Sequence, residues 1–143
     1  QELDSMIRAI FLLSKSINER NHLMNQTLNG EKWKLRNSGN ITDRQMVEIA
    51  DTLNGWTKSV YKFGCAFIHL SAFHDNTQDP FRNLDSDEII SVKAHLNYYH
   101  DFPMTSELTM NSISPYLPRV FDKIEDNLEC YIKDLEAGRT ILL

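Results

Sequence analysis

Residues 41–70 carry the best helix-start signal in the sequence and read ITDRQMVEIADTLNGWTKSVYKFGCAFIHL. Thr42 is a favourable N-cap, and Gln45, three residues later, can complete a capping box. Apolar residues then recur at helical spacing, at Met46, Ala50, Leu53, Trp56, Val60, Phe63, Phe67 and Leu70. Because this period continues across Asn54-Gly55, we expect one long helix with a bend at the glycine.

Three further segments show the same period and end at recognisable stop signals. They run from Glu2 to about Leu28, from Asp85 or Ser86 to Asp101-Phe102-Pro103, and from Ser114-Pro115 to Gly138. The connecting segments are polar, and no run alternates in polarity as a strand would. We therefore predict an all-α fold, a bundle of four main helices joined by short polar loops.

Length, composition and charge narrow the class of protein. The 143 residues lie near the commonest domain size and are 41% hydrophobic, so we expect a single helical domain spanning residues 1–143. The net charge of −5 argues against a broad nonspecific DNA-binding surface. No apolar run approaches ~18 residues, so no membrane partner is expected.

The two cysteines, Cys65 and Cys130, each lie among apolar residues at helical spacing. Buried free thiols are the expected state, with a single disulfide as the alternative. Free thiols indicate a cytoplasmic protein, because reducing compartments keep thiols unpaired.

A tryptophan stands between two cations in the first polar loop, as Lys32-Trp33-Lys34. We expect the Trp33 ring to pack on the helices while both lysines stay in water. The alternative is a contact with an anion or a nucleotide.

Four of the five histidines lie in two similar strings, 26 residues apart. The first is His69-Leu70-Ser71-Ala72-Phe73-His74-Asp75, and the second is His95-Leu96-Asn97-Tyr98-Tyr99-His100-Asp101. Both follow the pattern H-L-x-x-[FY]-H-D, but their flanking sequences differ, which argues against an internal repeat.

The strings have a structural and a metal interpretation. Residues five apart lie about 140° apart around a helix, so the two histidines of one string should not share a face. Each histidine would then have its own structural role, such as a partly positive ring at a helix C-terminus. A metal site would need pairs from different helices, for example His69 with His95, because ligand pairs on one helix prefer spacings of three or four.

A third interpretation is RNA chemistry. A histidine can deprotonate a ribose 2′-hydroxyl while a nearby cation stabilises the charge that develops on the phosphate. Lys62 and His69 are seven residues apart, two turns on one face of the expected helix. Tyr61 and Tyr98 offer further hydroxyls or rings for stacking.

The stretch Tyr61-Lys62-Phe63-Gly64-Cys65-Ala66-Phe67-Ile68-His69, within an all-α chain, resembles the HEPN domains. Those are small helical bundles, many of them metal-independent RNases of toxin–antitoxin and phage-defence systems. Their motif is an arginine, four to six residues and a histidine on a core helix, and two copies usually form the active site at a dimer cleft. Lys62 stands where the family has arginine and lacks its bidentate fork, so a degenerate, noncatalytic relative is the second implication.

These observations define the expected site and its alternatives. We expect an endoribonuclease-type site with His69, Lys62 and His95 as catalytic residues and no metal or cofactor. The residues expected to line the binding region are His74, His100, Tyr98 and Tyr61. RNA and a second copy or another protein are the expected partners. The alternatives are a noncatalytic interaction module that uses the Ile141–Leu143 tail, and a metal-binding bundle enzyme.

Overall fold

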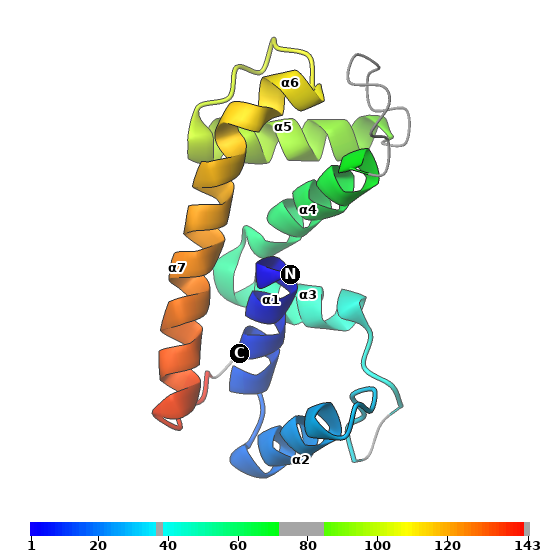
Figure 1. Cartoon of the computed structure of the whole chain (residues 1–143), viewed down its shortest axis with the longest axis vertical. Helices are drawn as coiled ribbons and strands as arrows, with labels where there is room; N and C mark the ends of the chain where they lie inside the picture. Colours follow the sequence, from blue (N-terminus) through cyan, green and yellow to red (C-terminus); the bar gives the residue numbers. More distant parts are fainter. Residues whose placement is uncertain (37–38, 72–84, 142–143) are drawn as a thin grey trace. The chain divides into compact units, whose positions relative to one another are not determined.

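The computed structural model describes residues 1–36, 39–71 and 85–141, and for residues 65–71 it describes the backbone only. Within these residues the chain forms seven α-helices and one short 3₁₀-helix (Figure 1). The helices are α1 (Glu2–Leu13), α2 (Ile17–Leu28), α3 (Asp43–Asn54), α4 (Thr57–Ser71), α5 (Ser86–His100), α6 (Met110–Ile113) and α7 (Leu117–Glu136), and the 3₁₀-helix is η1 (Ser114–Tyr116). The described part contains no β-strand beyond an isolated bridge between Lys34 and Asn40, so the all-α prediction is confirmed.

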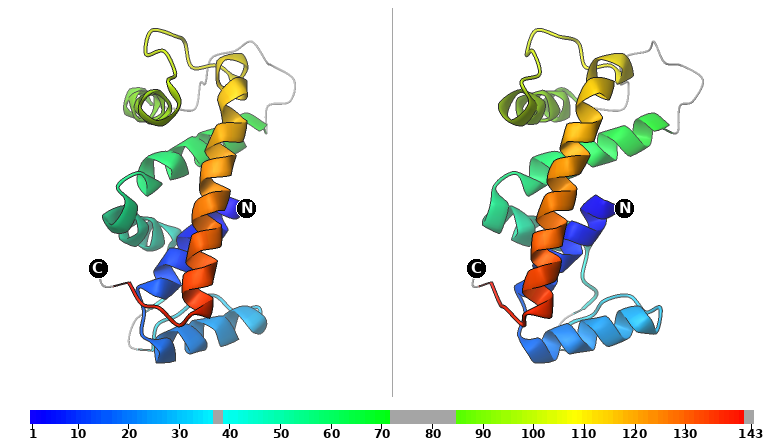
Figure 2. Two further views of the ribbon diagram at one scale, coloured as in Figure 1. Left: turned by 90° about the vertical axis from the view of Figure 1, so that its left-hand side faces the viewer. Right: turned by 60° about the vertical axis from the view of Figure 1, so that its left-hand side comes forward.

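The chain divides into two compact units. The first comprises Gln1–Thr57 together with Ile124–Leu143, and the second comprises Lys58–Lys123. Helix α7 contributes to both units and is one continuous ribbon (Figure 2). No helix in the described residues is both long and apolar enough to cross a membrane.

The single helix expected over residues 2–28 is two helices, α1 and α2. Ser16 caps α2 by accepting a hydrogen bond from the Glu19 backbone N–H at 3.4 Å. Arg20 is buried at the junction, where its guanidinium donates to the backbone oxygens of Leu12 at 2.8 Å and Leu13 at 3.3 Å. These carbonyls lie in the last turn of α1, and Arg20 adds to the hydrogen bonds that the backbone N–H groups of Lys15 and Ile141 donate to them, so Arg20 stabilises the break.

The long helix expected over residues 42–70 is also two helices, although its start was predicted correctly. Thr42 and Gln45 form the capping box, with the Thr42 backbone N–H donating to Gln45 Oε1 at 2.9 Å. The chain does not merely bend at Gly55. Helix α3 ends there, because Gly55 takes the left-handed conformation, with φ of 59°. The apolar period continues because Trp56, directly after this cap, is buried again.

The first unit has an apolar core from α1, α2 and α3, formed by Met6, Ile7, Ile10, Leu13, Leu23, Met46 and Ala50. Trp33 packs on it, with its ring centroid 6.0 Å from that of Phe11 and its Nε1–H donating to Thr27 Oγ1 at 2.7 Å. Lys32 and Lys34 are exposed, as predicted. The chain returns at residues 140–141, where the Ile141 backbone N–H donates to the Leu13 carbonyl at 2.9 Å.

In the second unit, α5 begins and ends where the sequence predicted. Asp85 and Glu88 form its capping box, and Asp101 ends it in the left-handed conformation, with φ of 60°. Helix α6 was not predicted; Thr109 caps it through the backbone N–H of Ser112 at 3.1 Å. The last helix begins at Leu117 rather than Ser114, because the segment around Pro115 forms η1 first.

Candidate functional site

The structure brings two of the predicted histidines together in the second unit. His95 and His100 are 3% and 6% exposed, and their ring centroids lie 5.9 Å apart. The expectation that these rings would not share a face is therefore wrong. The buried side of α5 includes His95, Leu96 and His100. It is wide enough to hold both imidazole rings, one at each edge.

The hydrogen bonding of this pair is incomplete. His95 Nδ1 lies 2.8 Å from Ser59 Oγ, near the start of α4. Either the Ser59 hydroxyl donates to Nδ1 or the Nδ1–H donates to the hydroxyl oxygen, depending on the tautomer. The Nε2 atoms of His95 and His100 have no hydrogen-bond partner among the described residues. Buried polar atoms without partners are rare in proteins, and each one marks a place where a functional role is worth testing.

A lysine and a tyrosine complete the cluster. Lys123, in the first part of α7, places its Nζ 3.4 Å from the centroid of the Tyr99 ring. The same ring lies 5.0 Å from that of His95, centroid to centroid. Burial lowers the pKa of the Lys123 ammonium below its usual range. We call His95, His100, Tyr99, Lys123 and Ser59 the paired-histidine cluster.

The environment keeps both imidazoles neutral at neutral pH. Burial, reinforced by the neighbouring His100 and Lys123, lowers the pKa of His95 from 6.5 to about 4. The pKa of His100 is also lowered, first by burial and then by Lys123 and Arg119, against the opposing effect of Asp101. Both imidazoles are therefore in the form that can accept a proton, and the lowered pKa makes each a weaker base than a free imidazole.

The other predicted site residues have different surroundings. Lys62 and Tyr61 lie on α4 and are partly buried, and among the described residues no hydrogen bond, ion pair or ring contact joins Lys62 to His95. Tyr98 is 80% exposed, with its ring edge-on to Tyr99 at 4.7 Å. The backbone of His69 belongs to α4, but its side chain lies outside the described residues, as does all of His74.

Sequence reasoning missed three members of the cluster. Tyr99 follows His95 by four residues, a spacing that places two side chains together on a helix, and this signal was available. Lys123 stands among acidic residues of the last helix, a pattern typical of an exposed, ion-paired face, and Lys133 does lie on such a face, where it pairs with Glu129 at 2.6 Å. Ser59 carries no sequence signal that distinguishes it from other helical serines.

The described residues contain no group of three or more histidine, cysteine, aspartate or glutamate side chains that could hold a metal ion. Within the paired-histidine cluster, the positive charge of Lys123 would oppose a bound cation. Cys130 is a free thiol and is exposed, so the expectation of burial is wrong for it, while the Cys65 side chain lies outside the described residues.

Comparison of the sequence with family models found no match, and neither did comparison of the chain with curated proteins or with solved structures.

Proposed function

We propose that this chain is a HEPN-like helical protein that cleaves RNA without a metal ion, in a bacterial defence or toxin–antitoxin setting. The observation that carries the proposal is the 5.9 Å separation of the His95 and His100 rings beside Lys123. A neutral imidazole can take the proton of a ribose 2′-hydroxyl, and a nearby cation can stabilise the charge that develops on the phosphate. The defence setting comes from the family resemblance alone.

The proposed reaction is an internal phosphoryl transfer. A neutral imidazole, through Nε2, takes the proton of a ribose 2′-hydroxyl, and the 2′-oxygen attacks the adjacent phosphorus. The bond from phosphorus to the 5′-oxygen breaks, which leaves a 2′,3′-cyclic phosphate and a 5′-hydroxyl. Lys123 stabilises the added negative charge on the phosphate, and its ammonium is the group available to protonate the departing 5′-oxygen.

Burial sets a condition on this chemistry. Because His95 and His100 are at most 6% exposed, RNA can reach their Nε2 atoms only after neighbouring side chains move.

The His69 and Lys62 assignment from the family resemblance is a separate part of the proposal, and the variants below test it separately.

The decisive experiment is cleavage of a fluorophore–quencher RNA in EDTA, with product analysis for a 2′,3′-cyclic phosphate. We expect His95→Asn and His100→Asn to reduce cleavage by at least about 100-fold, in line with the contribution of a general base. His22→Asn is the matched control, because His22 is the one histidine outside both strings and belongs to the first unit. Cleavage by all three variants at the wild-type rate would remove the paired-histidine cluster from catalysis.

Two further variants test the family motif. If His69→Asn and Lys62→Met abolish cleavage while the His95 variant does not, the family-type motif is the active site instead. If wild-type protein cleaves neither single-stranded nor structured RNA, the catalytic proposal fails and the noncatalytic alternative stands.

The second candidate is a noncatalytic interaction module that pairs with a second copy of itself. Ile17, Met24 and Leu28 on α2 are 58%, 47% and 81% exposed, and their spacing places them in one stripe along the helix. The exposed side chains of Asn21 and Asn25 beside this stripe are uncharged, so two identical copies would meet there without like-charge repulsion. Sedimentation equilibrium of wild type and Leu28→Glu tests it: a dimer that the variant converts to a monomer is expected, and a monomeric wild type would overturn it.

A further inference from the structure

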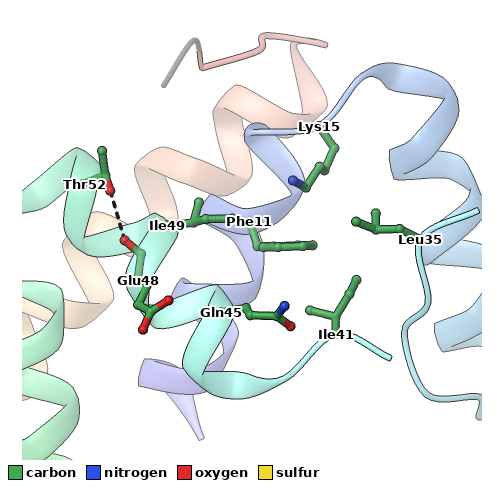
Figure 3. A pocket seen from close by; sticks show the side chains of 8 residues that line it. All are labelled: Phe11, Lys15, Leu35, Ile41, Gln45, Glu48, Ile49 and Thr52. Carbon is green, nitrogen blue, oxygen red and sulfur yellow. Dashed lines mark hydrogen bonds between the residues drawn. The ribbon is translucent and has the colours of Figure 1, made fainter. Parts of the chain in front are cut away.

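A surface pocket in the first unit has the composition of a small-ligand site. It has a volume of about 330 Å³ and lies between α1, α3 and the segment that joins α2 to α3 (Figure 3). Phe11 forms its floor, and the partly exposed aliphatic side chains of Leu35, Ile41 and Ile49 form its walls. Such a volume and such apolar walls are typical of sites for small organic molecules.

The pocket contains one uncompensated cation. The Lys15 ammonium lies over the Phe11 ring, 4.6 Å from its centroid, and points toward the centre of the pocket (Figure 3). Among the described residues no carboxylate lies within ion-pair distance of Lys15. An anionic group entering the pocket would therefore meet a positive charge that no carboxylate of the described residues pairs with.

A second donor faces the same space. The Gln45 side chain points into the pocket between Phe11 and Ile41 (Figure 3). Its carbonyl oxygen is already used in the capping box, where it accepts from the Thr42 backbone N–H at 2.9 Å and from the Thr42 hydroxyl at 3.1 Å. Its amide NH₂ group remains to donate to a ligand.

The one carboxylate in the lining does not cancel this preference. Glu48 accepts from Arg44 Nε at 2.9 Å, and its carboxylate is turned away from Lys15 (Figure 3). The lining therefore combines apolar walls, the Lys15 ammonium and the Gln45 amide donor. Its single negative charge, on Glu48, is paired with Arg44, which does not line the pocket.

We infer that this pocket binds a small amphipathic carboxylate, with an aromatic or branched aliphatic body against Leu35, Ile41 and Ile49 and the carboxylate on Lys15 and Gln45. The inference is independent of the proposed RNA cleavage, because the pocket lies wholly in the first unit and the paired-histidine cluster in the second.

Three probes of nearly the same size test the charge preference: 3-phenylpropionate, its neutral amide and the corresponding amine, 3-phenylpropylamine. Binding is followed by two-dimensional NMR of the ¹⁵N-labelled full chain. For a ligand of about eleven non-hydrogen atoms we expect a millimolar Kd for the carboxylate. The amide should bind roughly fivefold more weakly, because one exposed ion pair is lost. Signals of Ile41, Gln45 and Ile49 should shift, while those of His95 and His100 stay in place.

Variants test whether Lys15 supplies the positive charge that binds the carboxylate. Lys15→Met should remove the preference for the carboxylate, whereas Lys15→Arg should keep it. Lys32→Met is the matched control, since Lys32 is exposed, belongs to the same unit and does not line the pocket. Glu48→Gln should tighten carboxylate binding by a few-fold, because it removes a negative charge from the lining. Equal affinity for all three probes, or no shifts at 10 mM ligand, would overturn the inference whatever the RNA assay shows.

Discussion

The Nδ1 atom of His95 lies 2.8 Å from the Oγ atom of Ser59, in a hydrogen bond that ties the buried face of α5 to the start of α4. It is the one hydrogen bond that the described residues offer either ring nitrogen of His95. Ser59→Ala would leave both nitrogens of a buried imidazole without a partner. We expect the free energy of unfolding to fall by about 1–3 kcal/mol. Urea denaturation followed by circular dichroism measures it, and Ser59→Thr, which retains a hydroxyl, is the control. An unchanged midpoint for Ser59→Ala would show that this hydrogen bond contributes nothing.

The lowered pKa of His95 predicts a specific loss of stability in mild acid. The pKa is about 4 in the folded chain against an ordinary value of 6.5, so below pH 6.5 the unfolded chain binds more protons than the folded one. The free energy of unfolding should therefore fall between pH 6.5 and 4, by up to about 1.4 kcal/mol per pH unit from this residue. From about one pH unit above 6.5 the contribution is constant, because this imidazole is then neutral in both states.

A variant separates this effect from the titration of carboxylates. Thermal or urea unfolding of His95→Gln across the same pH range should give a shallower slope than wild type, because glutamine has no proton to gain. Parallel slopes for the two proteins between pH 6.5 and 4 would contradict a neutral, buried His95.

Gly55 is predicted to be costly to replace for conformational reasons alone. Its φ of 59° ends α3, and a Cβ added there would meet no atom within 4 Å. Gly55→Ala should therefore destabilise the chain by about 1 kcal/mol through backbone strain, without any steric clash. Gly39→Ala is the matched control, since a Cβ would be equally unobstructed there. Equal thermal midpoints for the two variants would argue against a left-handed cap at Gly55.

Arg20 is predicted to contribute far more than a surface arginine. Its guanidinium donates to three backbone oxygens, those of Leu12, Leu13 and Lys15, and to the hydroxyl of Thr140 at 3.1 Å. Arg20→Met should lower the free energy of unfolding by about 2–3 kcal/mol, since charged donors to buried acceptors are removed. Arg44→Met, which loses only an exposed ion pair to Glu48, should change it by less than about 1 kcal/mol. Chemical denaturation of both variants checks the ranking.

The ends of helices were predicted well where a capping residue determines them. The capping boxes that begin at Thr42 and Asp85, and the left-handed glycine at Gly138, all follow from a few adjacent residues. The breaks at Ser16 and Gly55 were missed for one shared reason. The apolar spacing of the sequence continues across each break. Across Gly55 it follows a buried face, with Ala50 before the break and Val60 after it, whereas in α2 the apolar Ile17 and Met24 are exposed. Periodicity alone does not distinguish a continuous helix from two helices in phase.

The candidate site was only partly accessible to sequence reasoning. Composition and the repeated string pointed to His95 and His100, but helical geometry alone predicted that their rings would point apart. Their convergence depends on how wide a face of α5 is buried. The contribution of Lys123 depends on a contact with Tyr99, 24 residues earlier in the chain, which no local pattern encodes.

The two-unit arrangement has a consequence for biosynthesis. Arg20 and its partner Thr140 are separated by 120 positions, and Ile141 donates to the Leu13 carbonyl. During synthesis, residues 1–57 therefore leave the ribosome long before the segment that completes their unit. Residues 58–123 leave it as one uninterrupted stretch. The second unit is therefore the first whose residues have all been synthesised. Helices α1 and α2 can form their last hydrogen bonds only after residues 124–141 have been synthesised. During that interval the Leu13 carbonyl and the Arg20 guanidinium lack the partners that residues 140–141 supply, so we expect the junction of α1 and α2 to be less stable than in the finished chain.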